Sequence, residues 1–261
     1  MDHKRGYSAW IDKRNLKNNI KFSELSFLVE LVKSKYGILQ RYYHFKRKIA
    51  GLTTLYDYDR ALPIKFQKAH AEAELPDYNR ALPIKFQKAH AEAELPDLIY
   101  ESFGKISPHL AEIVPVFFAK KWLHTAVYNG KINDAFSHPS TKHPYILLNY
   151  HGGLDDLIRL AHELGHGVHQ YLAREQGILN LGPSPIIGEI PALFSELLLY
   201  STLLEKSDSA EERLYLLTNL IESIFNNVYR QISIFEFEDK VQRKVLKTPE
   251  NFFTSNIFND L

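Results

Sequence analysis

Two histidines and a glutamate stand at the spacing of a metal-binding helix near the middle of the chain. They form the motif His162-Glu163-x-x-His166. Residues four apart lie about 40° apart around an α-helix, so two imidazoles at this spacing can converge on one ion. Neutral imidazoles bind Zn²⁺, and the adjacent carboxylate can take a proton from a water whose pKa the ion lowers. The motif predicts one zinc ion per chain, with His162 and His166 as ligands and Glu163 as general base.

The segment that carries this motif, residues 154–175, has the pattern of a helix with one buried face and one functional face. Apolar and polar residues both follow spacings of three and four. The apolar stripe consists of Leu154, Leu157, Ala161, Leu164, Val168 and Leu172. Gly165 and Gly167 each cost such a helix up to about 1 kcal/mol, which predicts a close backbone approach at these positions. The alternative, a surface helix with two histidines, leaves both glycines unexplained.

A third ligand is expected because catalytic zinc sites use three protein ligands and a water. The chain has no cysteine, so the ligands are limited to His, Asp and Glu. Glu189 is the predicted third ligand, in a helix that begins at Ser184 and Pro185 and is kinked at Pro191. Glu196, two turns further along, is either an alternative ligand or a partner that orients a ligand imidazole.

Two more polar residues of the 154–175 helix belong to the candidate site. His169 lies one turn beyond His166 on the polar stripe, where it lines the substrate pocket, orients a ligand or is an ordinary surface histidine. Asp156, in the first turn, is assigned to the same surroundings of the metal or to the substrate pocket.

The elements expected around this helix give a mainly α fold with a small antiparallel β-sheet. Residues 22–50 have the period of one helix, and 98–123 that of a helix pair broken at Pro108 and Pro115. Residues 125–150 have β-like composition and an Asn-Gly turn signal. The capping box Ser209-x-x-Glu212 is expected to open a long helix that Pro249 stops.

A tandem repeat interrupts this pattern. Residues 58–77 recur as residues 78–97, with Asp59 against Asn79 as the one difference. Two copies are too few for a solenoid, so we interpret the repeat as a linker or insertion. The predicted organisation is an N-terminal helical segment at 1–57, the repeat at 58–97, and a catalytic region at 98–261.

Composition excludes several other classes of partner. The formal net charge is +1, from 32 basic and 31 acidic residues, so no overall field favours nucleic acid. Tyr42 and Tyr43 are expected in the core and not on a base-stacking surface, because no second basic aromatic cluster accompanies them. The N-terminus lacks an apolar signal core, and no apolar run reaches the roughly 18 residues of a membrane span. These observations predict a cytoplasmic protein that binds neither nucleic acid nor membrane.

Several blocks together resemble the oligoendopeptidase F branch of the thimet oligopeptidase family. They are residues 18–52, 98–113, 130–173 and 222–238, which include the His-Glu-x-x-His helix. The resemblance implies a mainly helical zinc endopeptidase of short peptides, with a zincin-type catalytic domain and a deep channel that excludes folded proteins. It places the metal histidines on His162 and His166, the catalytic glutamate on Glu163 and the third ligand on Glu189. It also suggests that the strand at 143–150 is the sheet edge that pairs with substrate backbone.

The chain also departs from this family. Members are roughly twice as long and carry a downstream His- and Tyr-bearing segment that stabilises the oxyanion; no counterpart occurs before Leu261. Asp134 stands where a glycine is usual. The catalytic region is therefore expected to be incomplete at its C-terminus. Two alternatives follow: an inactive or half-site fragment that binds zinc or peptide and needs a missing C-terminal half, and a metallocarboxypeptidase with the same motif.

Overall fold

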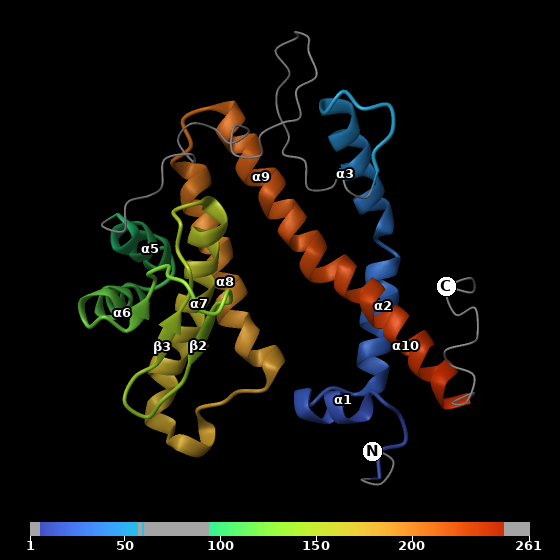
Figure 1. Cartoon of the computed structure of the whole chain (residues 1–261), viewed down its shortest axis with the longest axis horizontal. Coiled ribbons are helices and arrows are strands. Elements are labelled where there is room, and N and C mark those ends of the chain that lie inside the picture. The colour runs from blue at the N-terminus through green and yellow to red at the C-terminus, as the bar shows by residue number, and fades with distance from the viewer. Residues whose placement is uncertain (1–5, 57–58, 60–93, 248–261) are drawn as a thin grey trace. The chain divides into compact units, whose positions relative to one another are not determined.

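The protein is described here by a computed structural model that covers residues 6–56, 59 and 94–247 (Figure 1). The predicted class is confirmed, because the described elements are mainly helices with one small sheet. The described chain divides into two compact units. One contains residues 6–56 with 218–247, and the other contains residues 94–217. The repeat at 58–97 and Pro249 fall almost wholly outside the described residues.

In the unit that contains both ends of the chain, all the described regular elements are helical. Its elements are α1 (Asp12–Asn18), α2 (Phe22–Lys33), α3 (Tyr36–Ile49), the end of α9 (Ala210–Phe225), a π-helical turn (Asn226–Arg230) and α10 (Gln231–Lys247). Val29, Val32 and Tyr42 pack against aromatic and apolar residues of the 225–232 region. Tyr42 is therefore a core residue, as its sequence context predicted. The single helix expected over 22–50 is wrong in detail, because a turn at Ser34 and Lys35 separates α2 from α3.

A buried ion pair stabilises this helical unit. The Lys46 side chain is 1% exposed, and its Nζ lies 2.6 Å from Oε1 of Glu222. Tyr42 donates its hydroxyl hydrogen to the same oxygen at 2.5 Å. Burial, followed by the hydrogen bond to Glu222, raises the pKa of the Tyr42 phenol above its ordinary value. A charge removed from water is stable only with such partners.

The other unit is built around α7 (Leu154–Ala173) and α8 (Pro185–Glu205), which pack along each other. Helices α5 (Leu95–Gly104) and α6 (Pro108–Ala119) complete it, and short 3₁₀ turns at Arg174–Gln176 and Ile178–Asn180 link α7 to α8. Pro108 begins α6, as expected, but Pro115 lies inside that helix and does not break it. The buried residues of α7 include Leu157, Leu160, Ala161 and Leu164.

The sheet of this unit has three short strands, β1 (Leu123–His124), β2 (Phe136–His138) and β3 (Tyr145–Leu147), in the order β1-β3-β2. Strands β2 and β3 are antiparallel, as predicted, whereas β1 pairs with β3 in parallel. The expected edge strand at 143–150 is therefore wrong: β3 is the central strand, and β2 is an edge. Strands this short carry too few residues for an alternating pattern to define their neighbours.

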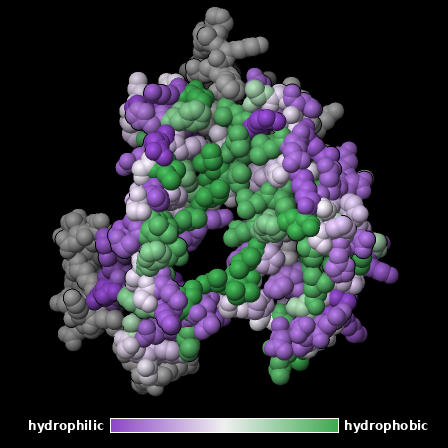
Figure 2. Space-filling view, turned by 180° about the vertical axis from the view of Figure 1, so that it is seen from behind, coloured by the Kyte–Doolittle hydropathy of each residue, from purple (hydrophilic) through white to green (hydrophobic). Residues whose placement is uncertain are grey.

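Hydrophobic side chains also reach the surface, and Figure 2 shows broad hydrophobic areas on the face that it draws. On α8 the exposed large residues are Ile186, Ile187, Ile190, Leu193, Phe194 and Leu197. By its length and mean hydropathy, α8 is the one described helix that could cross a bilayer, although two glutamates interrupt its apolar sequence. Core helices of globular proteins pass the same test, and α8 packs against α5 and α7.

Candidate metal centre

The two glycines of α7 allow other elements to approach this helix closely on two sides. A Cβ on Gly165 would lie 2.5 Å from the carbonyl oxygen of Pro191 and 2.7 Å from Cα of Ala192, both on α8. A Cβ on Gly167 would lie 2.9 Å from Ile146 of β3 and 2.9 Å from the Phe117 ring of α6. Because two residues subtend about 200° around a helix, these contacts are on opposite faces. The close backbone approach predicted at these positions is confirmed for Gly165, whereas the atoms that approach Gly167 belong to side chains.

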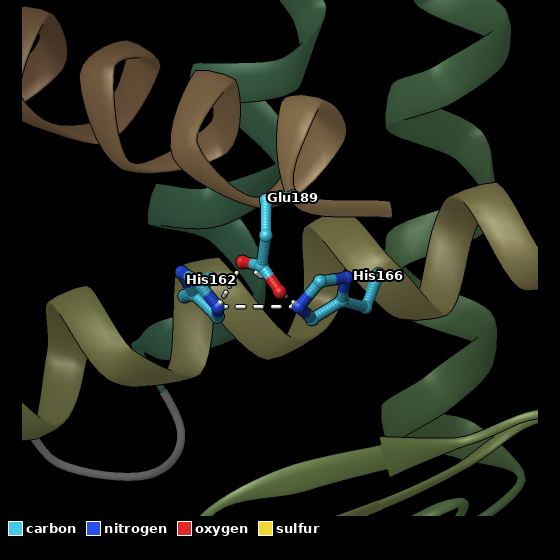
Figure 3. A group of neighbouring side chains, drawn as sticks. All are labelled: His162, His166 and Glu189. Carbon is cyan, nitrogen blue, oxygen red and sulfur yellow. Dashed lines mark hydrogen bonds and ion pairs between the residues drawn. The ribbon is translucent and has the colours of Figure 1, made fainter. Parts of the chain in front are cut away.

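The crossing at Gly165 brings a carboxylate of α8 over the two histidines of α7. Figure 3 shows Glu189 extending from α8 toward the space between the two rings. The Nε2 atoms of His162 and His166 are 3.2 Å apart, and their ring planes are inclined at 82°. Oε2 of Glu189 lies 3.4 Å from Nε2 of His162 and 3.7 Å from Nε2 of His166. Three side chains, two from α7 and one from α8, therefore present their donor atoms to one point.

These separations fit a tetrahedral metal ion. Ligand atoms about 2.0–2.1 Å from Zn²⁺ at tetrahedral angles are about 3.3 Å from one another. The three observed distances, 3.2, 3.4 and 3.7 Å, are close to that value. The donor set of two imidazoles and one carboxylate is that of catalytic zinc sites, which leave the fourth position to water. The Glu189 side chain is 53% exposed, so solvent reaches this position.

Glu196 contacts the opposite nitrogen of one of these rings. Its Oε1 lies 2.6 Å from Nδ1 of His162, and its side chain is 13% exposed. A carboxylate at Nδ1 fixes the tautomer of the ring and leaves Nε2 free to bind an ion. Of the two roles considered for Glu196, the geometry supports that of an orienting partner.

Glu163 lies beside this cluster in a buried position. The residue is 5% exposed, and its Oε2 has no hydrogen-bond partner among the described residues. Burial raises the pKa of this carboxyl to about 7; the charge of His162 lowers it, and those of Glu189 and Asp134 raise it. A carboxylate with a pKa near neutrality and a free oxygen can both take up and release a proton.

The two histidines differ in their electrostatic surroundings. Burial lowers the pKa of His162, but the hydrogen bond and charge of Glu196, with the charge of Glu163, outweigh it and raise the pKa overall. Burial and the charge of His162 lower the pKa of His166, against the charge of Glu189 and a hydrogen bond with the backbone of Gly188. The pKa of His162 is therefore raised, and that of His166 is lowered.

The remaining predicted residues lie outside the converging group. His169 is half-buried one turn beyond His166 and does not belong to the three residues whose donor atoms converge. Asp156 accepts a hydrogen bond from the His151 amide at 2.8 Å, which ties the start of α7 to the chain before it. Asp134 is exposed and acts on Glu163 through its charge.

One interacting pair of residues was not predicted from the sequence. The Ser137 hydroxyl of β2 donates to Oε1 of Gln170 at 2.7 Å, and Nε2 of Gln170 lies 3.4 Å from the Ser137 carbonyl oxygen. Gln170 is four residues after His166 on α7. Gln170 follows His166 at the same four-residue spacing that separates the two histidines, and this spacing could have indicated that it lies on the same face.

A helix bearing His-Glu-x-x-His, crossed by a second helix that bears a glutamate, defines a zincin-type helical catalytic domain. Comparison with known proteins gives the family: residues 3–261 match the model described as peptidase family M3, and the chain belongs to this family. The chain is 26% identical over 244 residues to oligopeptidase PepF of Bacillus subtilis, covering 90% of this chain and 33% of that protein. It is 30% identical over 223 residues to an oligoendopeptidase F homologue of Lactococcus lactis, covering 82% and 33%. The resemblance to oligoendopeptidase F is thereby confirmed.

Solved structures agree with this assignment. A crystal structure from Chlamydophila abortus, described as that of a peptidase, has a TM-score of 0.72 and 25% identity, covering 91% of this chain and 37% of that one. The PZ peptidase A structure has a TM-score of 0.70 at 16% identity, which shows the shared fold. The chain spans a quarter to a third of the length of the first curated relatives that it matches.

Proposed function

We propose that this chain carries the catalytic zinc site of an endopeptidase that hydrolyses short peptides. The observation that carries the proposal is the meeting of His162, His166 and Glu189 at separations of 3.2, 3.4 and 3.7 Å. Membership of peptidase family M3 supports the hydrolysis of peptide bonds, and the names of the relatives support oligopeptides as substrates.

The proposed chemistry divides between the ion and the chain's own residues. His162, His166 and Glu189 would hold a Zn²⁺ ion, which would supply a Lewis acid and lower the pKa of a bound water toward about 7. Glu163 would accept a proton from the attacking water and return it to the leaving amine. Its burial supports this role, because the raised pKa places the carboxyl near neutrality. Glu196 holds the His162 ring in the tautomer that leaves Nε2 unprotonated.

The substrate is proposed to pair with the edge of β2. The Ile146 amide donates to the Trp122 carbonyl at 2.9 Å, so the backbone groups of Ile146 point toward β1. Ser137 is the register partner of Ile146, and the two form a non-hydrogen-bonded pair. The amide and carbonyl of Ser137 therefore point away from β3, toward the open edge, with which no other described strand pairs. An extended peptide can pair with these groups whatever its side chains, which suits a peptidase of broad specificity.

The test combines metal analysis with cleavage of a peptide blocked at both ends. The parent chain is expected to contain one zinc ion and to cleave the peptide internally, and a chelator should abolish cleavage. Glu163→Gln should keep the zinc ion and lose hydrolysis, because it removes the base and leaves the three ligands intact. If Glu163→Gln cleaves as fast as the parent chain, the proposed mechanism is wrong.

Product analysis and mixing separate the alternatives. Stepwise removal of C-terminal residues from an unblocked peptide, without internal cleavage, would indicate a metallocarboxypeptidase. Activity that appears only after a separately expressed C-terminal half of a family M3 relative is added would indicate a fragment that needs a partner. A chain that binds neither zinc nor peptide contradicts all three hypotheses.

A further inference from the structure

In the 94–217 unit, one register pair of the sheet contacts α7, the helix that carries the two histidines. Ser137 of β2 and Ile146 of β3 stand opposite each other and point to the same face. Ile146 is 1% exposed and approaches Gly167 of α7 so closely that a Cβ there would lie 2.9 Å from its Cδ1. Ser137 contacts Gln170, one helical turn further along. The two contacts lie directly beyond His166 on α7.

The two contacts differ in what they can fix. The contact of Ile146 is apolar and tolerates sliding, since dispersion has little directionality. The contact of Ser137 is directional, because both ends of the Gln170 amide are used: Oε1 accepts from the hydroxyl at 2.7 Å and Nε2 lies 3.4 Å from the carbonyl oxygen. Phe136 and His138, the neighbours of Ser137 in β2, are exposed on the opposite face. Among the three residues of β2, Ser137 is thus the one that faces α7.

We propose that Gln170 is a positioning residue that sets the height and orientation of the β2 edge relative to the metal helix. This inference rests on the proposed function, in which the peptide backbone pairs with Ser137. The carbonyl that Nε2 of Gln170 approaches is the one that points to the open edge, and a carbonyl oxygen has a second lone pair for a substrate amide. Gln170 therefore holds the acceptor that the substrate uses, and it is not one of the three residues whose donor atoms converge.

Loss of the contact between Gln170 and Ser137 should change peptide binding and leave the chemical step unchanged. Without the tether, β2 samples positions from which the substrate cannot reach the metal, and the apparent affinity falls by the fraction of time spent in the competent position. The three ligands and Glu163 remain on α7 and α8, so zinc binding and the catalytic step are preserved. A residue that only stabilised the fold would not separate these quantities.

The experiment compares Gln170→Leu with Gln176→Leu, an exposed glutamine in the turn that follows α7. For Gln170→Leu we expect KM to rise about three- to tenfold, with kcat and zinc affinity within about twofold of the parent chain. Gln170→Glu keeps the acceptor for the Ser137 hydroxyl and loses the donor, so its KM should be intermediate. Ser137→Ala should add little to Gln170→Leu, since both remove parts of one interaction.

Amide hydrogen exchange supplies a measurement that does not depend on activity. The amides of Phe136 and His138 point toward β3 and should be protected; in Gln170→Leu they should exchange faster, and in Gln176→Leu they should not. If exchange at 136–138 and KM in Gln170→Leu both match the Gln176→Leu control, the inference is overturned. It is equally overturned if kcat and zinc content fall together with the rise in KM. A parent chain that neither binds nor cleaves peptide overturns the proposed function instead, and the exchange result still decides the tether.

Discussion

The carboxylate of Glu196 lies 2.6 Å from Nδ1 of His162, while Nε2 of the same ring faces Glu189 and His166. One imidazole is therefore held between two carboxylates of α8 that are seven residues apart. The half-exposed carboxylate of Glu189 faces Nε2, and the more buried carboxylate of Glu196 contacts Nδ1. This division of roles leads to the first prediction.

Glu196→Gln should weaken zinc binding without abolishing it. The amide cannot replace the charge at Nδ1, and loss of such an orienting partner costs about 10- to 100-fold in metal affinity. Competition with a chromophoric chelator measures the affinity. Glu211→Gln, at an exposed position in the first turn of α9, is the control and should match the parent chain. Equal affinities for both variants would exclude the orienting role of Glu196.

His162→Ala and His166→Ala should each lose the zinc ion, whereas His169→Ala should keep it. The first two remove donor atoms of the converging group, and His169 is not part of that group. Elemental analysis after gel filtration gives the zinc-to-chain ratio for each variant. A zinc-free His169→Ala protein would show that the ligand set is assigned wrongly.

Gly165→Ala should destabilise the fold and weaken the metal site together. The new methyl group would lie 2.5 Å from the Pro191 carbonyl oxygen, so α8 must move away from α7. Overpacking of this kind costs about 1–3 kcal/mol, and it shifts Glu189 and Glu196 with the helix. Urea unfolding and chelator competition measure the two effects.

The control for Gly165→Ala is Gly37→Ala in α3, where an added Cβ meets nothing within 4 Å. That substitution should stabilise the protein by up to about 1 kcal/mol, because alanine loses less backbone entropy than glycine in a helix. If the Gly165→Ala variant proves at least as stable as the Gly37→Ala variant, the close crossing of α7 and α8 is contradicted.

Glu222→Gln should destabilise the helical unit that contains both ends of the chain. It removes the charge that compensates Lys46, which is 1% exposed, and hydrogen bonds to charged groups contribute about 1.5–3 kcal/mol. The double variant Lys46→Met/Glu222→Leu should recover part of this loss, since it replaces both members of the ion pair with apolar side chains. Chemical denaturation of the single and double variants measures both.

The exposed pair Arg14–Glu238, with side chains 51% and 42% exposed, gives the comparison for this prediction. Arg14→Gln should cost less than about 1 kcal/mol because solvent screens the pair. A similar cost for Glu222→Gln and Arg14→Gln would show that the buried lysine is compensated by other groups.

The sequence revealed the parts of the site that depend on local order. The His162 to His166 spacing, the two glycines of α7 and the start of α8 at Pro185 all follow from helical periodicity and capping chemistry. Glu189 was proposed from its place in that helix, and the structure brings it within 3.7 Å of both imidazoles.

The features that escaped prediction depend on contacts between distant segments. The order β1-β3-β2 joins strands of two or three residues, and no alternating pattern is long enough to define it. The pairing of residues 6–56 with 218–247 places the ends of the chain in one unit, which local periodicity cannot indicate. Gln170 belongs to no motif, and its hydrogen bond with Ser137 joins residues 33 positions apart in the sequence.

The backbone contact at Gly165 has a further consequence for protein engineering. The two imidazoles, the carboxylates that touch them and the buried carboxyl of Glu163 all come from α7 and α8, which meet at this glycine. A transplant of that crossing into an unrelated four-helix scaffold carries the complete set of side chains with it. Such a graft would have to keep the glycine at this crossing, because the placement of all the charged side chains depends on it.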